Sequence, residues 1–199
     1  DDETDGTDEL LVEAVRVGFR DFLRRPASAG ELAGVIQRID NVKPEAAQRG
    51  RLLAVVSTKG GVGKSTIAIN TAVHAAITGN QRVLLVDASL QLGVSASLLN
   101  LTPTITFADV ASMQDRLDAT MLREIATQHE SGLHVLPAPP TPAEASEIDD
   151  TCMSIILGVA KSAYDLVIVD SFPLLDATTL AILDRAEHVC VVTENVVPT

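Results

Sequence analysis

The stretch Lys59-Gly60-Gly61-Val62-Gly63-Lys64-Ser65-Thr66 decides how this chain folds. Only Ser57 and Thr58 separate it from the continuous apolar run 52–56, and a helical pattern over 65–78 begins at its end. A strand, a glycine-rich loop and a helix in this order form a phosphate-binding loop, because glycines let backbone N–H groups turn inward around an anion. The helix N-terminus adds its dipole. The stretch therefore predicts a nucleoside triphosphate site, with Lys64 on the β- and γ-phosphates and the Ser65 hydroxyl on Mg²⁺.

The rest of the chain repeats the same alternation of elements. Short continuous apolar runs occupy 83–86, 133–136, 166–169 and 189–192, and continuous runs are typical of strands covered on both faces. Helical patterns over 65–78, 119–129 and 150–163 separate them. Strands that alternate with helices predict an α/β fold, a doubly wound and mostly parallel sheet of the P-loop NTPase type.

Two aspartates end predicted strands. Asp87 follows the run 83–86, and Asp170 follows the run 166–169. In open α/β sheets the ligand lies beyond the carboxyl ends of the strands, so both carboxylates are expected near the loop. Hard cations prefer oxygen ligands. Ser65, Asp87 and Asp170 are therefore the predicted Mg²⁺ ligands, with a helix cap or a turn aspartate as the simpler alternative for each carboxylate.

Composition limits the other functions. The 199 residues carry a net charge of −12, and from Arg51 onward there are eight Lys and Arg against sixteen Asp and Glu. This balance argues against a basic surface for nucleic acid, so DNA is not expected as a partner. Cys152 and Cys190 are isolated in the sequence, which fits a reducing cytoplasm.

The phosphate loop also carries a family resemblance. Thr58 stands where the first glycine of the common motif would be, and Lys59 is an additional lysine. The string Lys59–Ser65 resembles the deviant Walker A loop of the MinD/ParA group of ATPases. The resemblance implies binding of ATP with Mg²⁺ by the loop residues Lys59, Gly60, Gly61, Val62, Gly63, Lys64, Ser65 and Thr66. It also implies an ATP-dependent homodimer in which Lys59 reaches the partner's nucleotide, and catalytic roles for Lys59, Lys64 and Asp87; a solvated turn lysine is the alternative for Lys59.

One position departs from this family. Its members usually read Asp-x-Asp after the second strand, and the second Asp helps to position the attacking water. Here Ser89 stands in that place, in Asp87-Ala88-Ser89. A hydroxyl can orient water but cannot act as a base at neutral pH, so slow hydrolysis is expected.

Further strings resemble one branch of the family, the CpaE/TadZ ATPases that localise Flp/Tad pilus assembly at the cell pole. They are Leu90-Gln91-Leu92-Gly93, Ser131–Pro139 and Tyr164–Asp170 with Leu174-Leu175-Asp176. The resemblance implies pilus-assembly or polar localisation proteins as partners, and recruitment from the cytoplasm to the pole or inner membrane. No membrane-spanning run is visible, and the family's membrane helices would lie beyond Thr199.

The sequence before the loop predicts a separate unit. Residues 18–23, Pro26 and the helical pattern after it resemble the end of a receiver domain. We therefore expect the C-terminal part of a receiver-like domain over 1–40, a linker over 41–50, and a C-terminally incomplete ATPase domain over 51–199. Two other functions stay open on the sequence alone, namely a DNA-partition ATPase and a nucleotide-binding scaffold that does not hydrolyse ATP.

Overall fold

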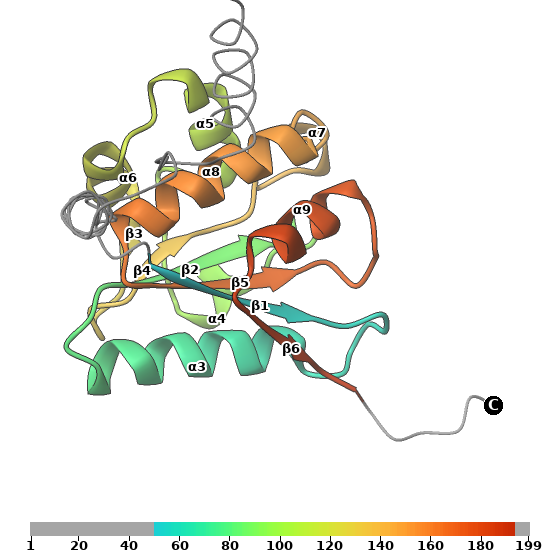
Figure 1. The fold of residues 1–199 in the computed structure, drawn as a ribbon, viewed down its shortest axis with the longest axis horizontal. Coiled ribbons are helices and arrows are strands. Elements are labelled where there is room, and N and C mark those ends of the chain that lie inside the picture. The colour runs from blue at the N-terminus through green and yellow to red at the C-terminus, as the bar shows by residue number, and fades with distance from the viewer. Residues whose placement is uncertain (1–49, 194–199) are drawn as a thin grey trace, which may run out of the picture. The chain divides into compact units, whose positions relative to one another are not determined.

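The computed structural model describes residues 50–193, which form a twisted sheet between two layers of helices (Figure 1). Six strands lie in the order β3-β4-β2-β5-β1-β6. Their bounds are β1 Arg51–Val56, β2 Val83–Ala88, β3 Thr127–Gln128, β4 His134–Leu136, β5 Leu166–Ser171 and β6 His188–Val191. All neighbouring strands are parallel except β3 and β4. The predicted α/β fold with a mostly parallel sheet is confirmed.

The helices cover the two faces unequally. Helix α3 (Lys64–Thr78) covers one face, and α5 (Phe107–Ser112), α6 (Ala119–Ile125), α8 (Asp150–Ala163) and α9 (Ala177–Arg185) cover the other (Figure 1). The shorter helices are α4 (Ser95–Leu98), α7 (Pro142–Ala145) and the 3₁₀ turn η1 (Gln114–Arg116). The predicted helices over 65–78 and 150–163 agree with α3 and α8.

The two cores follow the alternation of side chains along the strands. Leu84 and Val86 of β2 pack in the cluster that α8 closes, and Leu85 packs in the cluster that α3 closes. All six residues of β2 are buried, as a continuous apolar run predicts. Because faces alternate, Asp87 lies on the α3 side of the sheet, two residues beyond Leu85. The central strands therefore carry the site residues on the side where α3 begins.

The pattern over 119–129 ends earlier than predicted. Helix α6 stops at Ile125, because Ala126 is extended, and the next two residues pair antiparallel with β4 as β3. A turn with Gly132 at φ 85° reverses the chain, and the N–H of His129 donates to the carbonyl of Leu133 at 2.8 Å. Thr127 and Gln128, which the helical pattern included, therefore belong to a short antiparallel hairpin.

Strand β6 also differs from expectation. Its continuous run predicted cover on both faces, but Val189 and Val191 are 48% and 63% exposed. Within residues 50–193, β6 pairs only with β1 and forms the edge of the sheet. Val189 and Val191 therefore keep about half or more of their surface uncovered by the described residues.

The predicted receiver-like part over 1–40 lies outside the described residues, and so does all of the predicted linker over 41–50 except Gly50. Both stay predictions. No helix within residues 50–193 has the length and hydropathy to cross a bilayer.

Candidate nucleotide-binding site

The loop between β1 and α3 is open on the side where a phosphate would lie. Gly61 and Gly63 have φ values of 79° and 90°, which side-chain-bearing residues rarely adopt. A Cβ atom built on Gly60, Gly61 or Gly63 would meet no atom within 4 Å. Helix α3 starts directly after the loop, with no side chain capping its first N–H groups and no acidic residue in its first turn. These free N–H groups can bind an anion.

The first half of the loop is braced by its own chain. Ser57 is buried, and its hydroxyl donates to the carbonyl of Lys59 at 2.9 Å and accepts from the N–H of Lys59 at 3.1 Å. The Lys59 side chain is exposed at the surface. The backbone around Lys59 is thus held by Ser57, while the residue itself is exposed at the surface.

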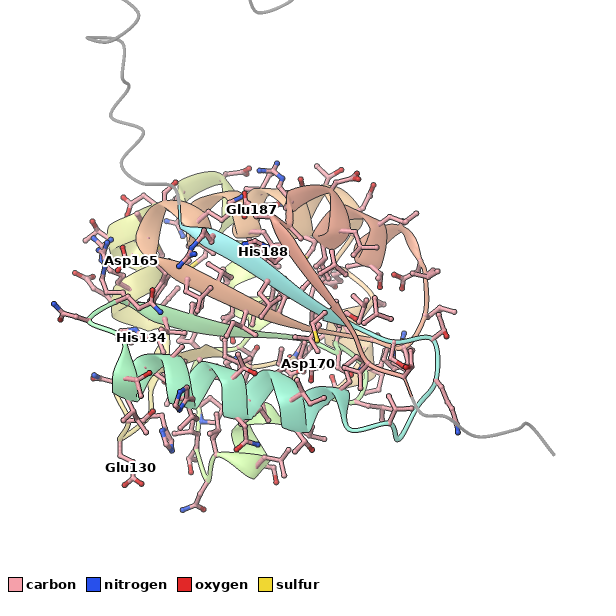
Figure 2. All side chains as sticks on the ribbon, turned by 60° about the horizontal axis from the view of Figure 1, so that its bottom comes forward. Glu130, His134, Asp165, Asp170, Glu187 and His188 are labelled. Carbon is pink, nitrogen blue, oxygen red and sulfur yellow. The ribbon has the colours of Figure 1, made fainter. Side chains whose placement is uncertain are left out.

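Lys64 and Asp170 form a buried ion pair at the start of α3. The Nζ of Lys64 lies 3.6 Å from Oδ1 of Asp170, and the two side chains are 9% and 0% exposed. Figure 2 shows Asp170 at the carboxyl end of the strands, close to where α3 begins. The motif and the strand-end argument predicted these two residues at one site, and the structure brings them together.

Asp170 has unused ligand capacity. Within the part of the chain that the structure describes, neither of its carboxylate oxygens accepts a hydrogen bond of ordinary geometry. Burial raises the pKa of Asp170, although the Ser65 hydroxyl and the Lys64 ammonium oppose this effect. Lys64 and Ser65 lie near this buried carboxylate without forming a hydrogen bond of ordinary geometry, so its oxygens are still available to a divalent cation that prefers oxygen ligands.

The carboxylate of Asp87, unlike that of Asp170, accepts hydrogen bonds from the backbone. Asp87 is 1% exposed, and its Oδ1 and Oδ2 accept backbone N–H groups from Ser89 at 3.2 Å and Ser95 at 2.9 Å. Burial is the largest cause that raises the pKa of Asp87; the Ser95 N–H opposes it, and the charge of Asp170 adds to it. The carboxylate thus holds together the two ends of the loop 88–95. Its predicted roles in metal binding and catalysis stay predictions.

Gly93 closes the same loop. A Cβ atom there would lie 2.2 Å from the Cβ of Ala138 and 2.9 Å from Oδ2 of Asp87. Neither Gly93 nor Ser95 was assigned a role from the sequence. Gly93 belongs to the family-like string Leu90–Gly93, but that string does not reveal its packing, because the contacts are with a strand end six or eight residues earlier and with the segment after β4. Ser89 is 7% exposed, so the residue at the expected water-positioning place is buried beside Asp87.

The chemistry of the donor set fits a nucleotide with Mg²⁺. The open glycine loop and the N-terminus of α3 offer N–H donors to phosphate, and Lys64 offers a positive charge. Ser65, half-buried at the start of α3, and Asp170 offer oxygen atoms to a hard cation. No cluster of three or more His, Cys, Asp or Glu side chains that could hold a metal alone occurs in residues 50–193. A cation held by Ser65 and Asp170 would need further ligands, and the phosphate oxygens of a bound nucleotide can supply them.

Comparison with known proteins identifies the family that this chain matches. The family model described as an AAA domain matches residues 50–196. The chromosome-partitioning ATPase Soj of Thermus thermophilus is 34% identical over 142 residues, which are 71% of this chain and 53% of that protein. The chain spans about half the length of the chromosome-partitioning relatives it matches.

Solved structures show the same relationship. The ParA family ATPase of Chlorobium tepidum matches with a TM-score of 0.67 and 31% identity, over 71% of this chain and 59% of that one. Cobyrinic acid a,c-diamide synthase of Mycobacterium smegmatis, solved with an ATP analogue and magnesium, matches with a TM-score of 0.57 and 27% identity. That match covers 72% of this chain and 58% of the synthase.

Proposed function

Because the chain belongs to the AAA-domain family that matches residues 50–196, within the MinD/ParA superfamily of ATPases, we propose that it is an ATP-dependent dimerisation switch. In this proposal it binds ATP with Mg²⁺ and hydrolyses ATP slowly. The observation that carries the proposal is the pair Lys64 and Asp170 at the mouth of the open glycine loop. Asp170 keeps both oxygens without hydrogen bonds there, at the place where a metal bound to phosphate would lie.

Each residue of the loop has a proposed task. The N–H groups of residues 60–66 hold the phosphates, Lys64 neutralises their charge, and Ser65 and Asp170 hold Mg²⁺. Mg²⁺ supplies charge neutralisation at the phosphoryl group when it is bound. Lys59, exposed and with its backbone braced by Ser57, contacts the nucleotide of the second protomer. Asp87 acts on water through the loop 88–95, where Ser89 replaces a second carboxylate.

The finer proposal concerns the task of the switch. The strings around Leu90, Pro137 and Leu174 resemble the CpaE/TadZ branch, so we place the switch in positioning of a Flp/Tad pilus-assembly complex at the cell pole. The partners are then a second copy of the chain and a pilus-assembly or polar protein. In full-length protein, loss of polar Flp/Tad assembly on Lys64→Ala would support this task, and normal assembly would contradict it.

Sizing by light scattering tests the dimer switch. ATP with Mg²⁺ should shift the chain toward dimers more than ADP does, and Lys64→Ala should remove the shift together with nucleotide binding. Lys59→Ala should keep nucleotide binding and lose only the dimer. The same size with and without ATP, at concentrations where ATP is bound, would reject the proposal.

DNA partition is the second candidate, and the 34% identity to Soj favours it. Such an ATPase would bind DNA without sequence preference when loaded with ATP. The acidic balance of the chain opposes it. A DNA mobility shift that requires ATP and weakens with salt would establish this candidate in place of pilus positioning.

A further inference from the structure

A cavity lies on the face of the sheet opposite the phosphate loop. Its volume is about 270 Å³, and it is bounded by three segments that are distant in sequence. They are the loop after β2, the helix α7 with the residues that follow it, and the loop from β5 into α9. Ala88 marks the change of face, because it packs in the cluster closed by α8 while Asp87, one residue earlier, lies on the α3 side. The cavity is thus separate from the nucleotide site.

The floor of the cavity is apolar and its rim is polar. Leu90, Ala145 and Ile148 are 8%, 7% and 6% exposed and form the floor. Gln91 and Ser146, which are exposed, lie at the rim with the half-buried Asp176. The volume falls below the usual 300–1,000 Å³ of pockets for whole small molecules. It suits one apolar side chain of a partner better than a nucleotide or a cofactor.

The charge around the cavity has one sign. Asp176 caps α9 with Oδ1, which accepts the N–H of Thr179 at 2.8 Å. Its second oxygen makes no hydrogen bond or ion pair with any residue between 50 and 193. Among residues 50–193, no lysine or arginine lines the cavity, and none occurs in the stretches 83–115, 124–160 and 162–184 from which its described walls come. A cation would complement this rim.

Apolar surface continues past the rim. Leu174 and Leu175, between the wall residues Phe172 and Asp176, are 56% and 58% exposed. Large apolar side chains exposed beside a cavity mark a surface that another molecule covers. Together with the acidic rim, they define the chemistry of that molecule.

We propose that this cavity anchors a segment of a partner protein that inserts one apolar side chain, with lysine or arginine beside it. The apolar side chain packs on Leu90, Ala145 and Ile148, and the cation faces Asp176. Two walls of the cavity directly follow the strand ends that carry Asp87 and Asp170. The partner therefore contacts the two segments that begin at the strand ends of the proposed nucleotide site.

Selection of a random peptide library on the full 199-residue chain, without nucleotide, tests the proposal independently of ATP binding. We expect enriched peptides that combine one large apolar residue with flanking Lys or Arg. Ser146→Arg, which adds bulk and a cation at the rim, should weaken an enriched peptide about tenfold or more. Asp176→Asn keeps a helix-capping side chain and removes the charge, so it should weaken binding less and reduce its salt dependence.

Ser162→Arg is the matched control, because it places the same change on an exposed residue near the other end of α8. It should leave peptide affinity unchanged. The proposal fails if no peptide is enriched, if the enriched peptides lack basic residues, or if Ser146→Arg binds them as well as the parent chain does. Self-association that Ser146→Arg abolishes, without peptide enrichment, would instead assign the cavity to a second copy of this chain.

Discussion

Asp87 and Asp170 are direct partners across the neighbouring parallel strands β2 and β5, yet only Asp87 accepts backbone hydrogen bonds among the described residues. Asp87 accepts two backbone N–H groups from the loop that follows it, whereas the oxygens of Asp170 accept none among the described residues. Both carboxylates are buried, and burial raises the pKa of each. The two strand ends thus separate two tasks: Asp87 shapes a loop, and Asp170 keeps its oxygens for a ligand.

Asp170→Asn should separate nucleotide binding from its dependence on Mg²⁺. The amide keeps the size of the side chain but is a poor ligand for a hard cation. We expect ATP affinity in the presence of Mg²⁺ to fall about tenfold or more, and affinity without Mg²⁺ to change less. Calorimetric titration with and without Mg²⁺ measures both. Asp165→Asn, just before the same strand, is the control, and an unchanged Mg²⁺ dependence in Asp170→Asn would contradict the role of Asp170.

Asp87→Asn should loosen the loop 88–95. An asparagine oxygen can replace one of the two acceptors, so one buried N–H, of Ser89 or Ser95, loses its partner. The expected cost is about 1–3 kcal/mol in the free energy of unfolding. Hydrogen exchange should be faster at the Ser89 and Ser95 amides than in the parent chain. Equal protection at both amides would show that the loop does not depend on the carboxylate.

Gly93→Ala should reduce stability, whereas Gly60→Ala should reduce ATP affinity. The new Cβ at Gly93 would lie 2.2 Å from the Cβ of Ala138, so we expect a loss of stability of about 1–3 kcal/mol. At Gly60 the Cβ meets nothing within 4 Å, so stability should stay within about 0.5 kcal/mol while ATP affinity falls. Urea denaturation and ATP titration on both variants check this. A Gly60→Ala variant that binds ATP normally would place the phosphates elsewhere.

Ser89→Asp tests the reason proposed for slow hydrolysis. If the missing carboxylate limits water positioning, phosphate release should rise about tenfold or more over the parent chain. Ser89→Asn is the matched variant, since it has the same size and hydrogen-bonding reach without a basic carboxylate, and it should not accelerate release. Equal rates in Ser89→Asp and Ser89→Asn would refute the explanation. If the parent chain releases phosphate no faster than the Lys64→Ala variant does, the non-hydrolysing scaffold is favoured.

Acid stability should depend on Asp165 at the opposite end of the sheet from the site. Its carboxylate accepts from Nε and a terminal nitrogen of Arg82, at 3.2 and 3.0 Å, and from the Arg82 backbone N–H at 2.7 Å. These hydrogen bonds lower the pKa of Asp165 below its ordinary 3.8. Because the folded pKa is lower than the unfolded one, this stabilisation is complete above pH 3.8 and is lost as the pH falls below it.

The variant Asp165→Asn should therefore lose about 1 kcal/mol of unfolding free energy at neutral pH, since the pair is partly exposed. The difference from the parent chain should shrink below pH 3.8. Thermal denaturation across this range measures it. Asp184→Asn, at an exposed residue with no bonded partner among residues 50–193, is the control. A constant difference down to pH 2 would mean that the Asp165 charge is not the cause.

Much of this fold follows from local patterns. Helix α8 has the predicted bounds, because its buried residues repeat at helical spacing and Asp149 caps its first turn. Lys64 and Asp170 lie at the same edge of the sheet, as expected for a loop after β1 and the carboxyl end of a parallel strand, although their ion pair was not predicted. The bonds of Asp87 to Ser95, the packing of Gly93 on Ala138 and the cavity walls were not predicted. They join segments distant in sequence, and no periodic pattern encodes such contacts.

The ion pair of Lys64 and Asp170 makes the binding of nucleotide and the binding of Mg²⁺ depend on each other. Without a ligand, the lysine and the aspartate neutralise each other in a buried site. A bare cation would meet the charge of Lys64, and a bare triphosphate would meet the charge of Asp170. A lysine drawn toward phosphate releases the carboxylate for the metal, and a metal on the carboxylate releases the lysine for phosphate. Each ligand therefore raises the affinity for the other by the same factor, and in the proposed ATP site the pair acts as a coincidence detector for nucleotide and Mg²⁺ together.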